Sequence, residues 1–315
     1  RAKLGKGTLK FYSYLADTRL SLGTQNIDSL ELTDVFTLSN LNSFSTLTYT
    51  ADFNDKWSAY IGASYSYNDD DIAGELRNRE GELNMLDEEP FAASSFTSRT
   101  IENLTQTRFY LTRTFGNGND LKFGGEYLYS VDDNDFNPMT RPAFSQQAID
   151  HYKAAFTEAN VYFSRRFVTR LGLRMEHSTL LEGDQFNLAP RFSLGYELSD
   201  RAQLSLAYGR YYQRPDEDLL FSNVQNGTTY ANSTHYVLNL QNIGNAQKMR
   251  FEAFYKDYDK LFTFTGAPNT LGTLSNDGSG QAAGFELFWR DRKSVKNLDY
   301  WVSYSYLSAE RRFNN

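Results

Sequence analysis

A short run of aromatic and basic side chains is the strongest candidate for ligand chemistry in this sequence. Tyr211, Tyr212, Gln213, Arg214 and Pro215 follow one another directly. A tyrosine offers a flat face for stacking and a hydroxyl for hydrogen bonding, whereas an arginine offers a planar fork that matches a carboxylate or a phosphate. The run therefore contains residue types that bind anionic or aromatic ligands.

The residues around this run decide which side chains share a face. In residues 204–209 the large apolar side chains alternate with Ser, Ala and Gly, and the same count places Tyr211 on the small, polar side. In the preceding alternating segment, residues 191–198, the same count places Arg191 on the polar side. We keep Tyr211, Tyr212, Arg214 and Arg191 as ligand candidates. For Arg191, pairing with a carboxylate on the same face is the alternative that we favour.

Acidic runs form a second candidate site. Asp132, Asp133 and Asp135 stand where an alternating segment is predicted to pass into a long connection, and similar runs occupy residues 68–71 and 216–218. Carboxylate oxygens are the ligands that calcium prefers, but none of these runs has the spacing of an EF-hand loop. We therefore favour hydrated loop residues over a calcium site, and we expect no other cofactor.

Histidine placement argues against an enzyme. The three histidines, His151, His177 and His235, lie on different segments, and the chain contains no cysteine. A zinc site needs clustered ligands, such as a pair of histidines one helical turn apart. Neither a glycine-rich phosphate loop nor a nucleophile elbow is present. The sequence therefore predicts no enzymatic activity.

The segments that carry these residues have the alternation of β-strands. One face of residues 57–67 holds Trp57, Ala59, Ile61, Ala63, Tyr65 and Tyr67, and the other holds Ser58, Gly62, Ser64 and Ser66. The same period of two returns in residues 121–127, 191–198 and 285–290. A soluble sandwich would bury the apolar face against a second sheet, whereas a transmembrane barrel turns that face to lipid and its polar face to a wet interior.

Composition narrows the choice between these two architectures. Aromatic residues make up 16% of the 315 residues, yet the mean hydropathy is −0.59. No stretch approaches the roughly 18 consecutive apolar residues of a spanning helix, but a barrel strand needs only about 9 to 11 residues with every second one apolar.

The net charge of −7 argues against a nucleic-acid partner. The absence of cysteine is compatible with an oxidising periplasm.

The connections between the alternating segments favour the barrel. We predict about 13 strands, near 6–21, 38–53, 57–68, 99–115, 120–131, 152–166, 169–180, 187–198, 202–213, 233–244, 249–264, 282–292 and 299–311. Tight turns at 54–56, 116–119, 167–168, 199–201 and 244–247 alternate with connections at 22–37, 69–98, 132–151, 181–186, 214–232 and 265–281, which are long except for 181–186. Outer-membrane barrels have short periplasmic turns and long outer loops in this order. Most tyrosines are then interpreted as an aromatic girdle at the membrane boundary.

Several of these segments resemble the barrel of TonB-dependent outer-membrane receptors, in the variety found in Bacteroidota. The resemblance is carried by the hairpin Asn187–Leu198 with Leu204–Pro215, and by Ser233–Leu238, Phe251–Tyr258, Ala283–Leu287 and Trp301–Tyr306. It covers most of residues 187–311 and extends more loosely over the first half. It implies an antiparallel up-and-down barrel of about 22 strands around a plug. Residues 1–315 are then expected to be one barrel-domain fragment from the interior of the barrel, without plug or C-terminal strands.

The resemblance also implies function and partners. Such a receptor lies in the bacterial outer membrane and imports a nutrient when the TonB complex, acting through the plug region, supplies energy. The expected ligand is a small molecule, a glycan or a peptide, and Arg191 is expected to meet the plug if not a carboxylate. A surface lipoprotein, membrane lipid and lipopolysaccharide are further expected partners. A passive porin, a structural or adhesive barrel and a soluble carbohydrate-binding sandwich remain as alternatives.

Overall fold

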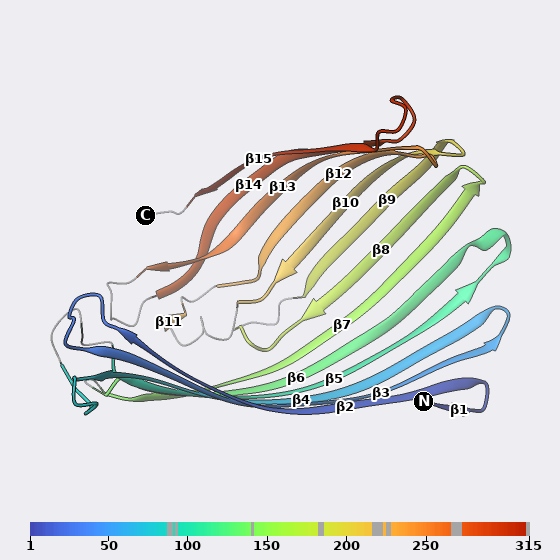
Figure 1. Ribbon diagram of the computed structural model, residues 1–315. Coiled ribbons are helices and arrows are strands. Elements are labelled where there is room, and N and C mark those ends of the chain that lie inside the picture. Colours follow the sequence, from blue (N-terminus) through green and yellow to red (C-terminus); the bar gives the residue numbers. More distant parts are fainter. Residues whose placement is uncertain are drawn as a thin grey trace. The chain divides into compact units, whose positions relative to one another are not determined.

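Alternating residues of this chain form long antiparallel strands. The computed structural model describes residues 1–86, 91, 94–139, 142–181, 186–215, 223–224, 228–265 and 273–312. Fifteen strands lie in one sheet and, apart from β11, pair antiparallel with neighbours in the sequence (Figure 1). They are β1 Ala2–Leu4, β2 Gly7–Gln25, β3 Thr33–Asn54, β4 Trp57–Arg77, β5 Phe96–Thr114, β6 Asp120–Asn137, β7 Phe144–Ser164, β8 Phe167–His177, β9 Asn187–Ser199, β10 Ala202–Gln213, β11 Asn223–Val224, β12 Ala231–Ile243, β13 Gln247–Thr265, β14 Thr273–Asp291 and β15 Tyr300–Arg312.

The predicted fold class and strand set are confirmed. β1 and β11 have only three and two residues, which leaves thirteen long strands in the described part of the chain, each overlapping one predicted segment. β11 pairs parallel with β14, as the one exception among the printed strand pairs. No helix in the described ranges is long and apolar enough to cross a membrane.

One predicted turn is wrong. The tight turn expected at residues 167–168 is made by Arg165 and Arg166, and Phe167 already belongs to β8. Phe167 instead pairs with Tyr196 of β9 and contacts its ring edge-on at 6.4 Å. The aromatic pairing gives Phe167 a place in the sheet, so the charged residues before it take the exposed turn.

The predicted long connections are shorter than expected, because the strands continue into them. β4 runs to Arg77 and β6 to Asn137, so the acidic runs at 68–71 and 132–135 lie inside strands rather than in loops. The acidic run at 216–218 lies outside the described residues. Polar side chains bond across strands at these ends, as described below, and this compensates for the low strand propensity of Asp and Asn.

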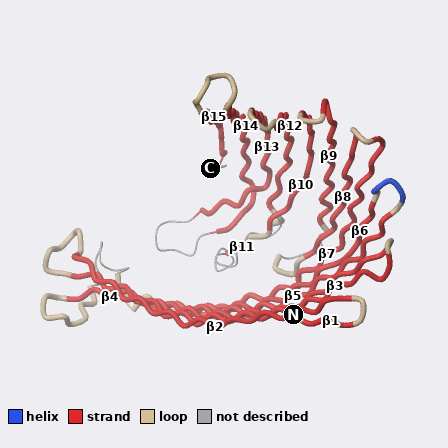
Figure 2. The backbone as a smooth tube through the Cα atoms, turned by 45° about the vertical axis from the view of Figure 1, so that its right-hand side comes forward, coloured by secondary structure: helices blue, strands red, loops and turns tan. Residues whose placement is uncertain are grey.

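The strands divide into two units, each with its own internal contacts. The first comprises residues 1–51, 60–109 and 126–152, and the second comprises residues 52–59, 110–125 and 153–315. In the second unit β8, β9, β10 and β12 to β15 run side by side, with their short connections at one end (Figure 2).

The register of the second unit separates two faces. The apolar face contains the row Leu194, Leu206 and Leu238, and the row Phe192, Tyr208, Tyr236 and Tyr255. The hydrophilic face contains the row Arg191, Gly209, His235 and Lys256. Many side chains on the apolar face stay exposed in the chain, Leu206 at 47% and Tyr236 at 50% among them. A sheet whose apolar face is open in this way needs an apolar surrounding medium.

In the first unit polar networks hold the strands together. Asn40 donates to Asn68 Oδ1 at 2.8 Å and to Asp70 Oδ1 at 2.6 Å, and Asn42 donates to Asn68 Oδ1 at 2.9 Å. Tyr14 extends this network by donating to Asn42 at 2.6 Å. Side chains from three strands, β2, β3 and β4, are therefore joined on one face.

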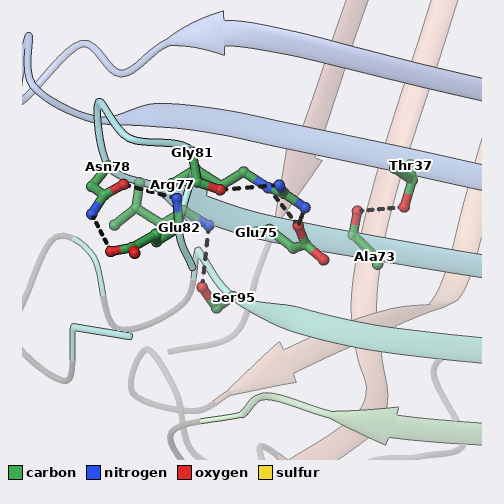
Figure 3. A network of polar contacts seen from close by, with 9 residues as sticks. Thr37, Ala73, Glu75, Arg77, Asn78, Gly81, Glu82 and Ser95 are labelled. Atoms are coloured by element: carbon green, nitrogen blue, oxygen red, sulfur yellow. Dashed lines mark hydrogen bonds and ion pairs between the residues drawn. The ribbon is translucent and has the colours of Figure 1, made fainter. Parts of the chain in front are cut away.

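A second network closes the end of β4 (Figure 3). Arg77 donates to the Glu75 carboxylate and to the carbonyl of Gly81. Asn78 and Glu82 are joined by three hydrogen bonds, one of them from the Glu82 backbone N–H at 2.8 Å and one from the Asn78 backbone N–H at 3.0 Å. These bonds satisfy backbone groups that the end of the β-ladder would leave exposed, so the strand can extend far past its apolar segment.

The connection between β14 and β15 lies at the end of the sheet that has the short connections. It contains a carboxylate, Asp291, whose contribution to stability can be tested. Asp291 accepts bonds from the hydroxyl and N–H of Ser294 at 2.6 and 2.9 Å, from Lys293 N–H at 2.7 Å and from Gln247 at 2.9 Å. These donors, Ser294 foremost, hold the pKa of the Asp291 carboxyl well below its ordinary value of 3.8. This residue lies at the connection, outside the membrane-spanning part of the strand.

Because the folded pKa is depressed, the stabilisation by Asp291 is present above the unfolded pKa and is lost as the pH falls below it. We expect Asp291→Asn to lower the free energy of unfolding by a constant amount between pH 8 and pH 5, roughly, and by progressively less below about pH 4. Denaturant unfolding at a series of pH values measures this difference. A difference that stays constant down to about pH 2 would contradict the role given to the carboxylate.

Candidate ligand-binding site

Two of the four predicted ligand residues meet on the hydrophilic face of the second unit. The Cζ atom of Arg191 lies 4.8 Å from the centre of the Tyr211 ring, within the range of a cation–π contact. Arg191 is placed on β9, opposite Gly172 of β8 and Gly209 of β10. The predicted polar orientation of Tyr211 agrees with this register.

Glycine makes the contact between Arg191 and Tyr211 possible. A Cβ atom at Gly209 would lie 2.7 Å from the Tyr211 hydroxyl and 2.9 Å from its ring, because Tyr211 folds back along its own strand. Any larger residue at position 209 would displace the ring. Gly209 therefore lets Tyr211 lie flat, within reach of the guanidinium on the neighbouring strand.

His235 joins this pair. Its ring centre is 4.8 Å from that of Tyr211 and 6.3 Å from that of Tyr258. Its Nε2 atom is buried and has no hydrogen-bond partner among the described residues. An unpaired buried nitrogen costs about 1–3 kcal/mol, so a water molecule or a ligand is expected to supply its partner. No local sequence signal identifies this histidine, because its position opposite Gly209 depends on the register between β10 and β12.

The expectation that Arg191 pairs with a carboxylate stays a prediction. Other arginines of this face do so: Arg170 lies 3.8 Å from Glu158, Arg174 lies 3.0 Å from Glu176 and Arg250 lies 2.9 Å from Glu252. Within the described residues Arg191 contacts the Tyr211 ring and no carboxylate. Its charge therefore remains available to an anion.

The strand ladder ends beside this group. Pairing between β9 and β10 stops at Arg191 and Gly209, and the next residue towards the start of β9 is Pro190, which has no N–H to donate. β10 continues to Gln213, paired with Ala231 of β12. The Arg191–Tyr211–His235 group thus lies where two neighbouring strands separate.

The other two predicted ligand residues are placed elsewhere. Tyr212 points to the opposite face, where Arg210 lies 5.2 Å above its ring and donates to Asn232 at 3.3 Å. Arg214 follows the end of β10 and is half-buried, next to the buried Pro215. The Arg191–Tyr211–His235 group contains neither of these two residues.

Alternation also separates the calcium candidates. Asp132 is buried on one face of β6, while Asp133 and Asp135 alternate to the other, where Gln147 donates to Asp133 at 2.7 Å. In the part of the chain that is described, no three His, Asp or Glu side chains form a group that could hold a metal ion. The expectation that these residues are hydrated rather than bound to calcium stays a prediction.

Comparison with known proteins identifies the family. The family model described as TonB dependent receptor-like, beta-barrel, matches residues 2–315. No curated protein matches the chain significantly.

Solved structures share the fold. The copper transporter OprC is 13% identical with a TM-score of 0.70, over 96% of this chain and 57% of that protein. The ferric-catecholate import receptor Fiu from K12 E. coli is 10% identical with a TM-score of 0.64, over 99% and 62%. The siderophore receptor PirA from Acinetobacter baumannii is 14% identical with a TM-score of 0.63, over 96% and 53%. The chain therefore spans little more than half the length of these structures.

Family barrels of this type are receptors and transporters of the bacterial outer membrane, and they are not enzymes. The open apolar face and the polar opposite face of the strands agree with that placement. The chain belongs to the TonB-dependent receptor family, because the β-barrel model of that family matches residues 2–315.

Proposed function

We propose that this chain is the wall of a receptor that imports a nutrient ligand with energy supplied by TonB, and that Arg191, Tyr211 and His235 contact the ligand on its way inward. The single observation that supports the site is an arginine that stacks on Tyr211 and has no carboxylate partner in the described residues. Next to it stands a histidine whose buried Nε2 has no partner there. The same ligand can bond to the Arg191 guanidinium and to the Nε2 atom of His235.

The chemistry of the group favours an anionic ligand with a flat portion. A guanidinium binds paired oxygen atoms in its plane, and the tyrosine and histidine rings offer stacking surfaces. The similar structures are named as transporters or receptors for copper, siderophores and ferric catecholates. A ferric catecholate is anionic, aromatic and rich in oxygen, so it is our first choice of probe for this receptor.

Uptake of radiolabelled ferric catecholate by cells that express the full-length receptor tests the proposal. We expect uptake to fall to the level of receptor-free cells when a protonophore is added or when TonB is deleted. A passive porin would lose no uptake under either treatment, because diffusion needs no protonmotive force. A structural or adhesive barrel would give no receptor-dependent uptake in any condition, and either result would contradict the proposal.

A further inference from the structure

The apolar face of the second unit contains a groove of about 420 Å³. A register row of the apolar face runs along it, from Ala159 of β7 through Leu171 of β8 and Phe192 of β9 to Tyr208 of β10, and Leu121 of β6 also lines it. Ala159 is the smallest member of the row and stands next to the larger Leu171. The groove is therefore a depression over Ala159 between larger side chains.

Among the described residues that line the groove, the polar groups next to Ala159 are bonded, and the hydroxyl of Tyr208 belongs to the other end of the row. Thr157 lines the groove, but its hydroxyl donates to the carbonyl of Lys122 at 3.3 Å. Pro190, a second lining residue, has no N–H. Arg191 is also at its margin, yet its guanidinium lies over Tyr211, which belongs to the hydrophilic face. The walls around Ala159 therefore favour an apolar occupant.

The Ala159 end of the groove lies nearer to the inner leaflet than the Tyr208 end. Ala159 lies in the half of β7, and Leu171 in the half of β8, that is nearer to the turn at Arg165 and Arg166. Short turns of outer-membrane barrels face the periplasm, and the strands tilt by about 35–45°. Because the row runs across the strands, it is inclined by about 45–55° to the membrane normal, so a lipid chain that follows it is inclined as well.

We propose that this groove holds one acyl chain of an inner-leaflet phospholipid. It is continuous with the apolar face that the outer membrane covers, which makes lipid the neighbour already in contact with it. Lipid tails are as apolar as leucine, so the affinity comes from van der Waals contact rather than from the hydrophobic effect. A chain seated over Ala159 touches side chains beneath and beside it, whereas a chain on the flat wall touches them on one side only.

Native mass spectrometry of the full-length receptor tests this proposal. The delipidated receptor is titrated with dipalmitoyl phosphatidylethanolamine, and the ratio of one-lipid to lipid-free protein is measured. The substitution Ala159→Leu fills the depression and removes roughly ten carbon–carbon contacts, so we expect this ratio to fall by about tenfold. Ala159→Val fills part of it and should give an intermediate loss.

Ala155→Leu is the matched control, because Ala155 lies on the same strand and face, opposite Met175, and does not line the groove. We expect its lipid ratio to equal that of the unsubstituted receptor. Heat-dependent mobility in electrophoresis confirms that each variant is folded, and Ala159→Val serves if Ala159→Leu does not fold. Unchanged lipid binding after filling, or an equal loss with Ala155→Leu, overturns the proposal. So does a receptor dimer that the filled variants dissociate, which would assign the groove to a second copy.

Discussion

Leu206→Arg should lower the free energy of unfolding by about 2–4 kcal/mol, since an arginine on the lipid side near the middle of a barrel strand costs this much. Leu206 is 47% exposed in the chain and lies between Leu194 and Leu238 on the apolar face. The charge would have to leave water for hydrocarbon, or distort the lipid around it. Denaturant unfolding of the full-length receptor in phospholipid vesicles measures the change.

The neighbouring residue supplies the control. Ala207 lies on the hydrophilic face of the same strand, opposite Ser193 and Val237. Ala207→Arg introduces the same charge one residue away, and we expect it to change the free energy of unfolding by no more than about 0.5 kcal/mol. Equal destabilisation by the two substitutions would contradict the assignment of faces, and with it the membrane placement of every strand in this register.

The second large effect concerns ligand binding. Arg191→Ala removes the only guanidinium that lies over the Tyr211 ring, at 4.8 Å, among the described residues. Hydrogen bonds to charged groups are worth about 1.5–3 kcal/mol, so we expect the dissociation constant for ferric catecholate to rise by about 10- to 100-fold. Equilibrium binding to outer membranes that contain the full-length receptor gives this value, separately from energised uptake.

Arg170→Ala is the control for this substitution. Arg170 lies on the same face but already donates to Asn160 at 2.8 Å and lies 3.8 Å from Glu158. Its loss should leave the dissociation constant within about twofold, because its charge is already compensated. If both variants weaken binding alike, the effect belongs to the general charge of the face, and the Arg191–Tyr211–His235 group is not the contact. Normal uptake with lost TonB dependence would instead contradict the energised mechanism.

The strands could be predicted because their signal is local. Alternation in residues 57–67 and 204–209 fixes both the strand and its apolar face, and the register pairs Leu206 with Leu194 as that alternation requires. The turn at Asp200 and Arg201 was also found, since turn residues stand directly between two alternating segments. The predicted strand ends were less accurate, because cross-strand bonds such as those of Asn68 extend the ladder beyond its apolar part.

The site could be predicted only in part, because it depends on register. Alternation placed Tyr211 and Arg191 on one face, but no local pattern shows that Gly209 lies between Arg191 and His235. That relation combines residues from three strands and is fixed by two hairpins. For the same reason the contact of Arg191 with the Tyr211 ring could not be predicted from the sequence.

Pro190 has a mechanical consequence for the tip of β10. Since β9 stops pairing with β10 at Arg191, residues 210–213 are held by β12 along one edge only. Bending that tip breaks half as many main-chain bonds as bending a strand in mid-sheet, so it can hinge on β12 while the part of β10 below Gly209 stays fixed. Tyr211 belongs to this tip of β10. We expect movement of the tip to change the distance between the Tyr211 ring and the Arg191 guanidinium, which is 4.8 Å in this structure.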